Sequence, residues 1–354
     1  MRFPKSRAVA IALGLGGLTL PLPAPAAETD KSLLSDAKHH FQVLPAVSAQ
    51  ELSSDKARLG RQLFFESRIS ADGNVSCSHC HQPALYGTDG LAKSVGVFGK
   101  PNARNAPTVF NAALQFKQHW RGDRESLEDQ AEKSLLGPAS FGNPDYTVVL
   151  AKLKSVPGYS DLFAKAFPED KDPINQKNLA SALSAYQRTL LTPSRFDAFL
   201  AGKANALTPL EKTGVRNFID VGCSSCRNGV DVGGDSFQKF GMVEDYWKET
   251  ASPQPDKGRA DVTKNDGDLY FFKVPSLRNV AKTAPYFHDG SVAELPRAVK
   301  IMAKVQLGKE LSDKDVEAIT AFLSSLTGSI PANFSAPEPF PDIPSAKGTQ
   351  KPQN

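Results

Sequence analysis

The sequence CSHCH, residues 77–81, is the most informative stretch of this chain. Two cysteines separated by two residues and followed at once by a histidine are the signature of covalent c-type heme attachment. The motif predicts that Cys77 and Cys80 form the two thioether bonds and that His81 is the proximal ligand of the iron.

A second stretch, CSSCR at residues 223–227, repeats the cysteine spacing. Cys223 and Cys226 keep the attachment pattern, but Arg227 stands where the histidine is expected. A guanidinium group has no lone pair to give to iron. Two short-loop disulfides or one shared zinc ion are the alternatives for the four cysteines. We favour heme because the first motif is complete.

The start of the chain predicts an exported protein. Arg2, Lys5 and Arg7 precede an apolar run from Ala8 to about Leu20, and Ala-Pro-Ala at 24–26 fits a small-residue cleavage site. We therefore expect residues 1–26 to be a signal peptide and the protein to be periplasmic, with no membrane anchor. The formal net charge is only +4 and includes these basic residues, which argues against nucleic-acid binding.

The helical patterns around the two cysteine pairs are similar. Before the first pair, Leu59, Leu63 and Phe64 share one face of a predicted helix. Before the second pair, Thr208 is a predicted N-cap, and Glu211 stands three residues later as in a capping box. An apolar stripe of Val215, Phe218 and Ile219 follows.

A closing helix is predicted at the end of each unit, over residues 178–191 and 312–328. This order predicts a mainly α fold with two cytochrome c-like domains in tandem. The expected boundaries are 27–195 and 196–330, with a Pro-rich tail at 331–354.

Several separate blocks resemble the bacterial diheme cytochrome c peroxidase family, which includes a diheme enzyme that matures a tryptophan-derived quinone cofactor. These blocks are "LGRQLFFESRIS", "CSHCH", "NAPTVFNAA", "HWRGDRESLEDQA", "FKVPSLRNVAKTAPYFHDGSV" and "MAKVQLG". The resemblance implies two hemes c, one that reacts with hydrogen peroxide and one that takes electrons from a small cytochrome c or cupredoxin. It also raises the prospect of a homodimer.

The resemblance assigns roles to individual residues. Trp120 matches a tryptophan between the two hemes, and Gln130 matches a glutamine on the peroxide side of the first. Met302 matches the axial ligand of the second heme iron. A calcium site between the domains corresponds to Asn105, Thr283 and Pro285, whose amide and carbonyl oxygens suit that ion. His288 lies in a matching block without an assigned role.

Three departures from the family pattern affect the chemistry. Arg227 replaces the second proximal histidine, Val97 falls where a distal histidine of the first heme is often found, and Ser140 falls at the place of a catalytic glutamate. Valine would leave the first iron open to peroxide. Serine cannot carry a proton near neutral pH, and positioned acid–base groups typically contribute ~10²–10⁴-fold.

Two classes of function follow. The first is a peroxidase whose activity is reduced by Arg227 and Ser140, or a related oxidase that acts on a protein or organic substrate. The second is an exported cytochrome that transfers electrons or senses peroxide without catalysis. The retention of Trp120, Gln130 and Met302 favours the peroxidase.

Overall fold

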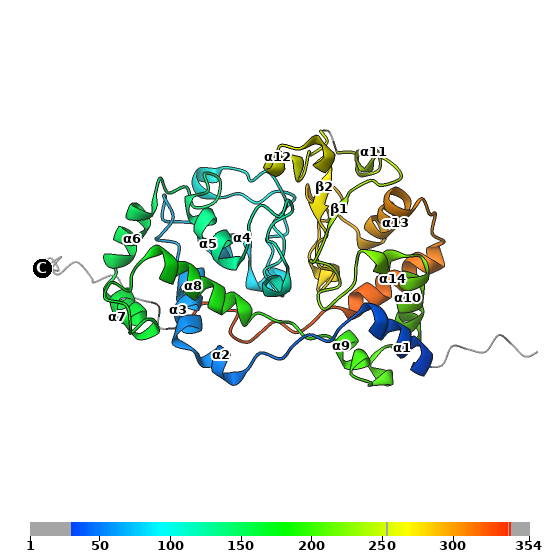
Figure 1. Cartoon of the computed structure of the whole chain (residues 1–354), viewed down its shortest axis with the longest axis horizontal. Coiled ribbons are helices and arrows are strands. Elements are labelled where there is room, and N and C mark those ends of the chain that lie inside the picture. Colours follow the sequence, from blue (N-terminus) through cyan, green and yellow to red (C-terminus); the bar gives the residue numbers. More distant parts are fainter. Residues whose placement is uncertain (1–29, 253, 339, 341–354) are drawn as a thin grey trace, which may run out of the picture.

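The computed structural model describes residues 30–252, 254–338 and 340, and it is mostly helical (Figure 1). The predicted signal peptide and the last part of the predicted tail lie outside the described residues. Within the described part, the only sheet has two antiparallel strands, β1 (Phe237–Lys239) and β2 (Phe271–Lys273). The prediction of a mainly α fold is confirmed.

The helices gather in two lobes, with the two strands near the contact between them (Figure 1). The first lobe contains α2 (Ala49–Ser53), α3 (Asp55–Phe64), α4 (Cys77–Cys80), α5 (Leu127–Leu136), α6 (Tyr146–Lys154), α7 (Pro157–Ala166) and α8 (Gln176–Arg188). The second contains α1 (Asp30–His40), α9 (Arg195–Leu200), α10 (Pro209–Asp220), α11 (Tyr246–Thr250), α12 (Ala260–Thr263), α13 (Leu295–Leu307) and α14 (Asp313–Ser325).

The same helix crossing is built twice. In the first lobe α3 packs on α8, and a Cβ atom at Gly60 would lie 1.9 Å from the carbonyl oxygen of Ala182. In the second lobe α10 packs on α14, and a Cβ atom at Gly214 would lie 2.0 Å from the carbonyl oxygen of Ala318. Each glycine therefore allows a backbone approach that a larger residue would block. The crossing supports the internal duplication inferred from the sequence.

The local signals of these helices are also confirmed. Thr208 caps α10, because its side chain accepts a hydrogen bond from the Glu211 amide and its own amide donates to the Glu211 carboxylate. Leu59, Leu63 and Phe64 on α3 are fully buried. The apolar faces thus point into the cores, as the helical period requires.

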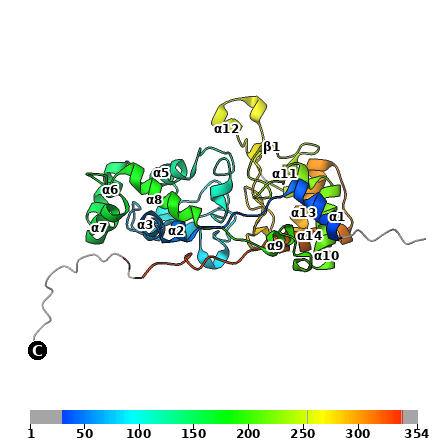
Figure 2. The same cartoon turned by 60° about the horizontal axis from the view of Figure 1, so that its bottom comes forward.

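Each lobe has its own hydrophobic core. Residues near the start of the chain belong to the core of the second lobe, and a residue near its end belongs to the core of the first. Helix α1 contributes Leu33 and Ala37 to the core of the second lobe, and Phe41 directly after it contacts the Phe196 ring at 5.3 Å between centroids. Phe334 joins the core of the first lobe. Figure 2 shows the two crossing segments, with α1 in blue on the second lobe and the red chain returning beneath the first.

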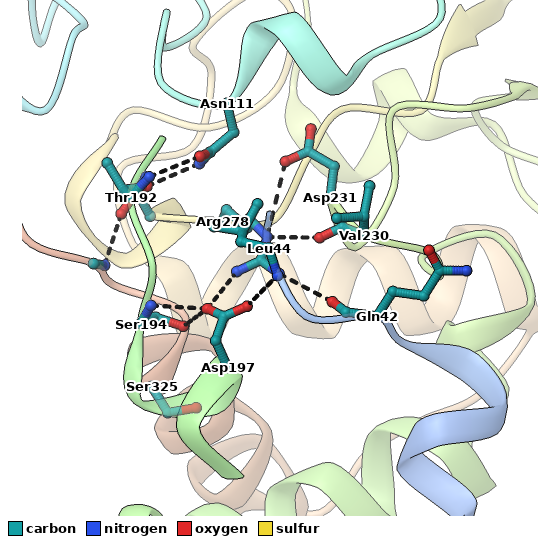
Figure 3. Close-up of polar contacts among 12 residues, drawn as sticks. Gln42, Leu44, Asn111, Thr192, Ser194, Asp197, Val230, Asp231, Arg278 and Ser325 are labelled. Atoms are coloured by element: carbon teal, nitrogen blue, oxygen red, sulfur yellow. Dashed lines mark hydrogen bonds and ion pairs between the residues drawn. The ribbon is translucent and has the colours of Figure 1, made fainter. Parts of the chain in front are cut away.

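A buried ion pair links Arg278 to Asp197 on α9, in the second lobe (Figure 3). Arg278 is 1% exposed, and its two terminal nitrogens donate to Asp197 of α9 at 2.9 and 3.0 Å. Asp197 also accepts from the amide of Leu44 and from both the amide and the hydroxyl of Ser194. Burial would raise the pKa of Asp197, but Arg278 and these hydrogen bonds hold it below its usual value.

Candidate functional site

The first cysteine pair lies on α4, a single helical turn that begins after Ser76. His81 follows directly, and its Nδ1–H donates to the carbonyl oxygen of Gly87 at 2.9 Å. This bond fixes the tautomer and leaves Nε2 with its lone pair available for iron. Cys77 and Cys80 are free and partly exposed. The residues of the first site therefore fit a c-type heme.

The loop after this site brings two of the departures together. Val97 is fully buried, and its amide donates to the carbonyl oxygen of Ser140 at 3.1 Å. The neighbouring Val95 carbonyl contacts Nε2 of His79, inside the CSHCH motif, at 2.9 Å. The two positions at which the resemblance leads us to expect a histidine and a glutamate are thus adjacent. They carry an apolar side chain and a hydroxyl, and their correspondence to those groups stays a prediction.

The second cysteine pair opens onto a cavity of about 240 Å³ that is partly open to solvent. Cys223, Cys226 and Arg227 line one part of it, and Met302 of α13 lines it as well. Burial raises the pKa of the Cys223 thiol to about 11, so this cysteine is a neutral thiol near pH 7. The structure brings all the residues predicted for the second heme to one apolar cavity.

Arg227 does not fit the role of an iron ligand. Its guanidinium donates to the carbonyl oxygen of Pro275 across the cavity wall. Burial lowers the pKa of Arg227 to about 10, which still leaves the group protonated at neutral pH. A charged donor without a lone pair cannot coordinate iron, so the ordinary His/Met ligand set is incomplete at this site.

Trp120 lies at the contact between the lobes. Its indole Nε1–H donates to the carbonyl oxygen of Asn105 at 2.9 Å, and its own carbonyl oxygen accepts from the amide of Lys273 on β2. Gln130, in contrast, does not line the large cavity, and its amide donates to Ser134 of the same helix. The predicted places and roles of Trp120 and Gln130 relative to the hemes stay predictions.

The three residues predicted for calcium all line the large cavity beside Trp120. The side-chain nitrogen of Asn105 donates to the carbonyl oxygen of Leu91 at 2.7 Å. Its Oδ1 is then the side-chain atom left for a cation. Thr283 and Pro285 are partly exposed on the opposite chain segment. The calcium site itself stays a prediction.

His288 occupies a box of aromatic rings. It is 3% exposed, stacks on Phe272 at 4.5 Å between ring centroids, and packs edge-on against Tyr246 at 5.4 Å. Its Nε2 lies 4.0 Å from a carboxylate oxygen of Asp256. Rings on several sides hold the imidazole in this box, so His288 is a poor replacement for the missing ligand at Arg227.

Sequence reasoning missed a buried polar group between the lobes. Lys273 is 4% exposed and donates to the side-chain oxygen of Gln115 in the first lobe. Burial lowers the pKa of Lys273 to about 8, although the charge of Asp231 opposes this. The "FKVPS" block is a weak signal for this lysine, because Lys273 is a polar residue at the end of an otherwise apolar strand.

The geometry does not support the two alternative predictions for the cysteines, short-loop disulfides and a shared zinc ion. All four are free thiols, so neither short-loop disulfide is formed. Among the described residues, no group of three or more histidine, cysteine, aspartate or glutamate side chains is arranged to hold a metal ion. The two pairs therefore do not share a zinc site.

Comparison with known proteins identifies the family. Residues 54–205 match the family described as di-haem cytochrome c peroxidase. The chain is 44% identical over 285 residues to cytochrome c551 peroxidase of Pseudomonas aeruginosa, with 80% of this chain and 81% of that protein covered. The chain belongs to the diheme cytochrome c peroxidase family. Members of this family are oxidoreductases, so the protein is an enzyme of the cytochrome c peroxidase type.

Other family members cover similar shares of the chain. Cytochrome c551 peroxidase of Nitrosomonas europaea is 38% identical and covers 85% of this chain and 87% of its own length. Methylamine utilization protein MauG of Methylorubrum extorquens is 32% identical and covers 83% of this chain and 84% of its own. A solved MauG-like protein associated with microbial copper homeostasis superimposes with a TM-score of 0.71 at 30% identity, covering 86% and 97% of the two chains.

Proposed function

We propose that the protein reduces hydrogen peroxide to water with electrons from a small cytochrome c or cupredoxin. The observation that carries this proposal is the first site, where the Gly87 carbonyl orients His81 for iron beside the two attachment cysteines. Heme bound there would supply the iron that reacts with peroxide. Because the Val97 side chain cannot bind iron, this position supplies no ligand that would compete with peroxide for the iron.

The chain's own residues set how well this reaction runs. Ser140 lies next to Val97 and offers a hydroxyl in place of a carboxylate, so proton transfer to peroxide loses a group of suitable pKa. Nearby Glu128 is paired with Arg188, and Asp129 with Lys133. These ion pairs hold the two carboxylates ionised on the helix surface. We therefore propose a slow proton delivery step.

Arg227 is proposed to impair the uptake of electrons at the second site. Replacement by histidine tests this directly. The Arg227→His variant should gain heme content or a high-potential couple with Met302, and its steady-state peroxide reduction with reduced cytochrome should rise at least tenfold. Arg58→His, on the exposed face of α3, is the matched control and should change neither quantity.

The measurements are a pyridine hemochrome count, a redox titration and peroxide turnover on both proteins. If the arginine form already holds two hemes and turns over as fast as Arg227→His, the proposed effect of Arg227 is refuted. If neither form reduces peroxide with reduced cytochrome, the peroxidase proposal fails.

A second candidate function is electron transfer or peroxide sensing without catalysis. The observation in its favour is that Val97, Ser140 and Arg227 are all departures at chemically active positions of relatives. Slow turnover combined with a reversible, peroxide-dependent change of the heme spectrum would support this alternative. Oxidation of a protein or organic substrate is the remaining variant within the enzyme class.

Three further features are proposed with this function. The protein is exported to the periplasm, which fractionation of cells would test. Among the described residues, no helix has the length and apolar character needed to cross a membrane. Calcium bound at Asn105, Thr283 and Pro285 would join the lobes beside Trp120, and EDTA treatment followed by elemental analysis tests it. A homodimer is testable by sedimentation.

A further inference from the structure

A continuous series of aromatic rings leads from the contact between the lobes to the surface of the second lobe. The Trp120 ring lies 6.3 Å from His288, and His288 lies 5.4 Å from Tyr246, measured between centroids. Tyr246 then contacts Trp247 at 5.2 Å, and Trp247 contacts Tyr270 at 4.8 Å. All of these separations are ring contacts within the range of ordinary aromatic packing.

The middle of this series is buried and its outer members reach solvent. Tyr246 is fully buried, whereas Trp120, Trp247 and Tyr270 are partly exposed. The chain has only two tryptophans, and both belong to the series. Met242 and Val243, which precede Trp247 by a few residues in the chain, are 58% and 59% exposed.

We propose that Trp120, Tyr246, Trp247 and Tyr270 form a relay through which small electron-rich phenols donate electrons to the interior without entering it. The proposal rests on the proposed reduction of peroxide, which supplies the oxidant. It adds a substrate class, the phenols, and a second route for electrons. Trp120 and His288 line the same cavity as Arg227, but this route runs along ring contacts and does not require an iron ligand at residue 227.

The proposed oxidation of phenols by peroxide is balanced in electrons and protons. One peroxide takes up two electrons and two protons and becomes two waters, and two phenols each release one electron and one proton to become phenoxyl radicals. Within the relay, Trp120 keeps its indole proton on the carbonyl oxygen of Asn105. Tyr246 gives its phenolic proton to the nearby Asp289 carboxylate, because the Asp256 carboxylate is held in an ion pair with Arg104. It recovers a proton when Trp247 or Tyr270 reduces it again.

The surroundings of Tyr246 are built for such an exchange. Its hydroxyl oxygen accepts a hydrogen bond from the amide of Asp256 at 2.9 Å. Burial, opposed by this hydrogen bond and assisted by the charges of Asp256 and Asp289, raises the pKa of Tyr246 above its usual value. The phenol is therefore neutral at rest, and loss of an electron must be accompanied by loss of its proton.

The test uses the full-length, heme-loaded protein with hydrogen peroxide and guaiacol (2-methoxyphenol). Tyr246→Phe keeps the ring packing but removes the redox-active hydroxyl, and guaiacol oxidation should fall at least tenfold. The double variant Trp247→Phe/Tyr270→Phe changes only partly exposed rings and should give the same loss. Tyr146→Phe, which removes a phenol that donates to the Glu132 carbonyl in the first lobe, is the matched control.

A second readout does not depend on turnover. After peroxide is added without any donor, mass spectrometry of peptides should find oxidised Trp247 and Tyr270 in the wild-type protein. This oxidation should be lost in Tyr246→Phe and kept in Tyr146→Phe. Circular dichroism confirms that each variant is folded before it is compared.

The outcomes separate the two proposals. If the wild-type protein reduces peroxide with reduced cytochrome but does not oxidise guaiacol, the relay is refuted and the proposed function stands. If guaiacol oxidation persists in Tyr246→Phe, or falls equally in Tyr146→Phe, the relay is also refuted. Guaiacol oxidation that depends on Tyr246 without any turnover of cytochrome supports the relay and refutes the proposed donor.

Discussion

Replacing Asp197 with alanine should destabilise the protein strongly, because the substitution leaves Arg278 as a buried charge without its main partner. The Asp197 carboxylate accepts two hydrogen bonds from Arg278, one from Leu44 and two from Ser194. Removal of one partner of a buried ion pair typically costs about 3–5 kcal/mol.

The magnitude is expected at the lower end of this range. Arg278 still donates to the carbonyl oxygens of Val230 and Gln42, and a carboxylate oxygen of Asp231 lies 4.0 Å from its Nε. We therefore expect a loss of about 3 kcal/mol in the free energy of unfolding. At roughly 2–4 °C per kcal/mol, this corresponds to a fall of about 10 °C in the melting temperature.

Urea unfolding followed by tryptophan fluorescence measures this loss. The control is Asp313→Ala, which removes a surface carboxylate paired with Lys300 and should change little. The double variant Asp197→Ala/Arg278→Met removes the unpaired charge as well and should recover part of the stability. A loss below about 1 kcal/mol for Asp197→Ala, or no recovery in the double variant, would refute the reasoning.

Burial raises the pKa of Asp231 to about 7 against the opposing charges of Arg278 and Lys273. The folded protein then holds a proton that the unfolded chain releases near pH 4, so the free energy of unfolding falls as pH rises from about 4 to 7. Asp231→Asn should flatten this pH dependence, which urea unfolding at pH 5 and pH 8 measures. Val97→His should bring an imidazole to the first heme and convert a high-spin resting EPR signal to a low-spin one; an unchanged spectrum would place residue 97 away from the iron. Gly60→Ala should cost more than the same change on an open helix surface, because its Cβ would meet the Ala182 carbonyl, and a gain in melting temperature would contradict the packing described.

The sequence predicted the features whose causes are local. The Thr208 cap, the apolar face of Leu59 and Leu63, and the adjacency of His81 to its cysteines all depend on neighbours within one or two helical turns. Met302 was assigned to the second heme through resemblance to relatives; it lines the same cavity as the second cysteine pair, and its role as a ligand stays a prediction. Expectations about Gln130 and calcium stay predictions.

Features that depend on distant segments were not predictable in this way. Arg278 and Asp197 are separated by 81 residues, and neither carries a local signal for a buried ion pair. From the sequence alone, Lys273 would be predicted to lie on the surface. The fold buries it against the first lobe. The aromatic series around Tyr246 combines rings from both lobes, and no period along the chain links them.

The crossing of the two end segments means that neither lobe can be completed from a contiguous stretch of chain. During synthesis, residues 30–41 emerge well before the helices α10 and α14, whose rings pack against Phe41. The first lobe waits in turn for Phe334, whose ring packs against Phe110 at 4.8 Å. A protease that cuts the chain between α8 and α9 would therefore leave the fragments held together, each still threaded into the other's core.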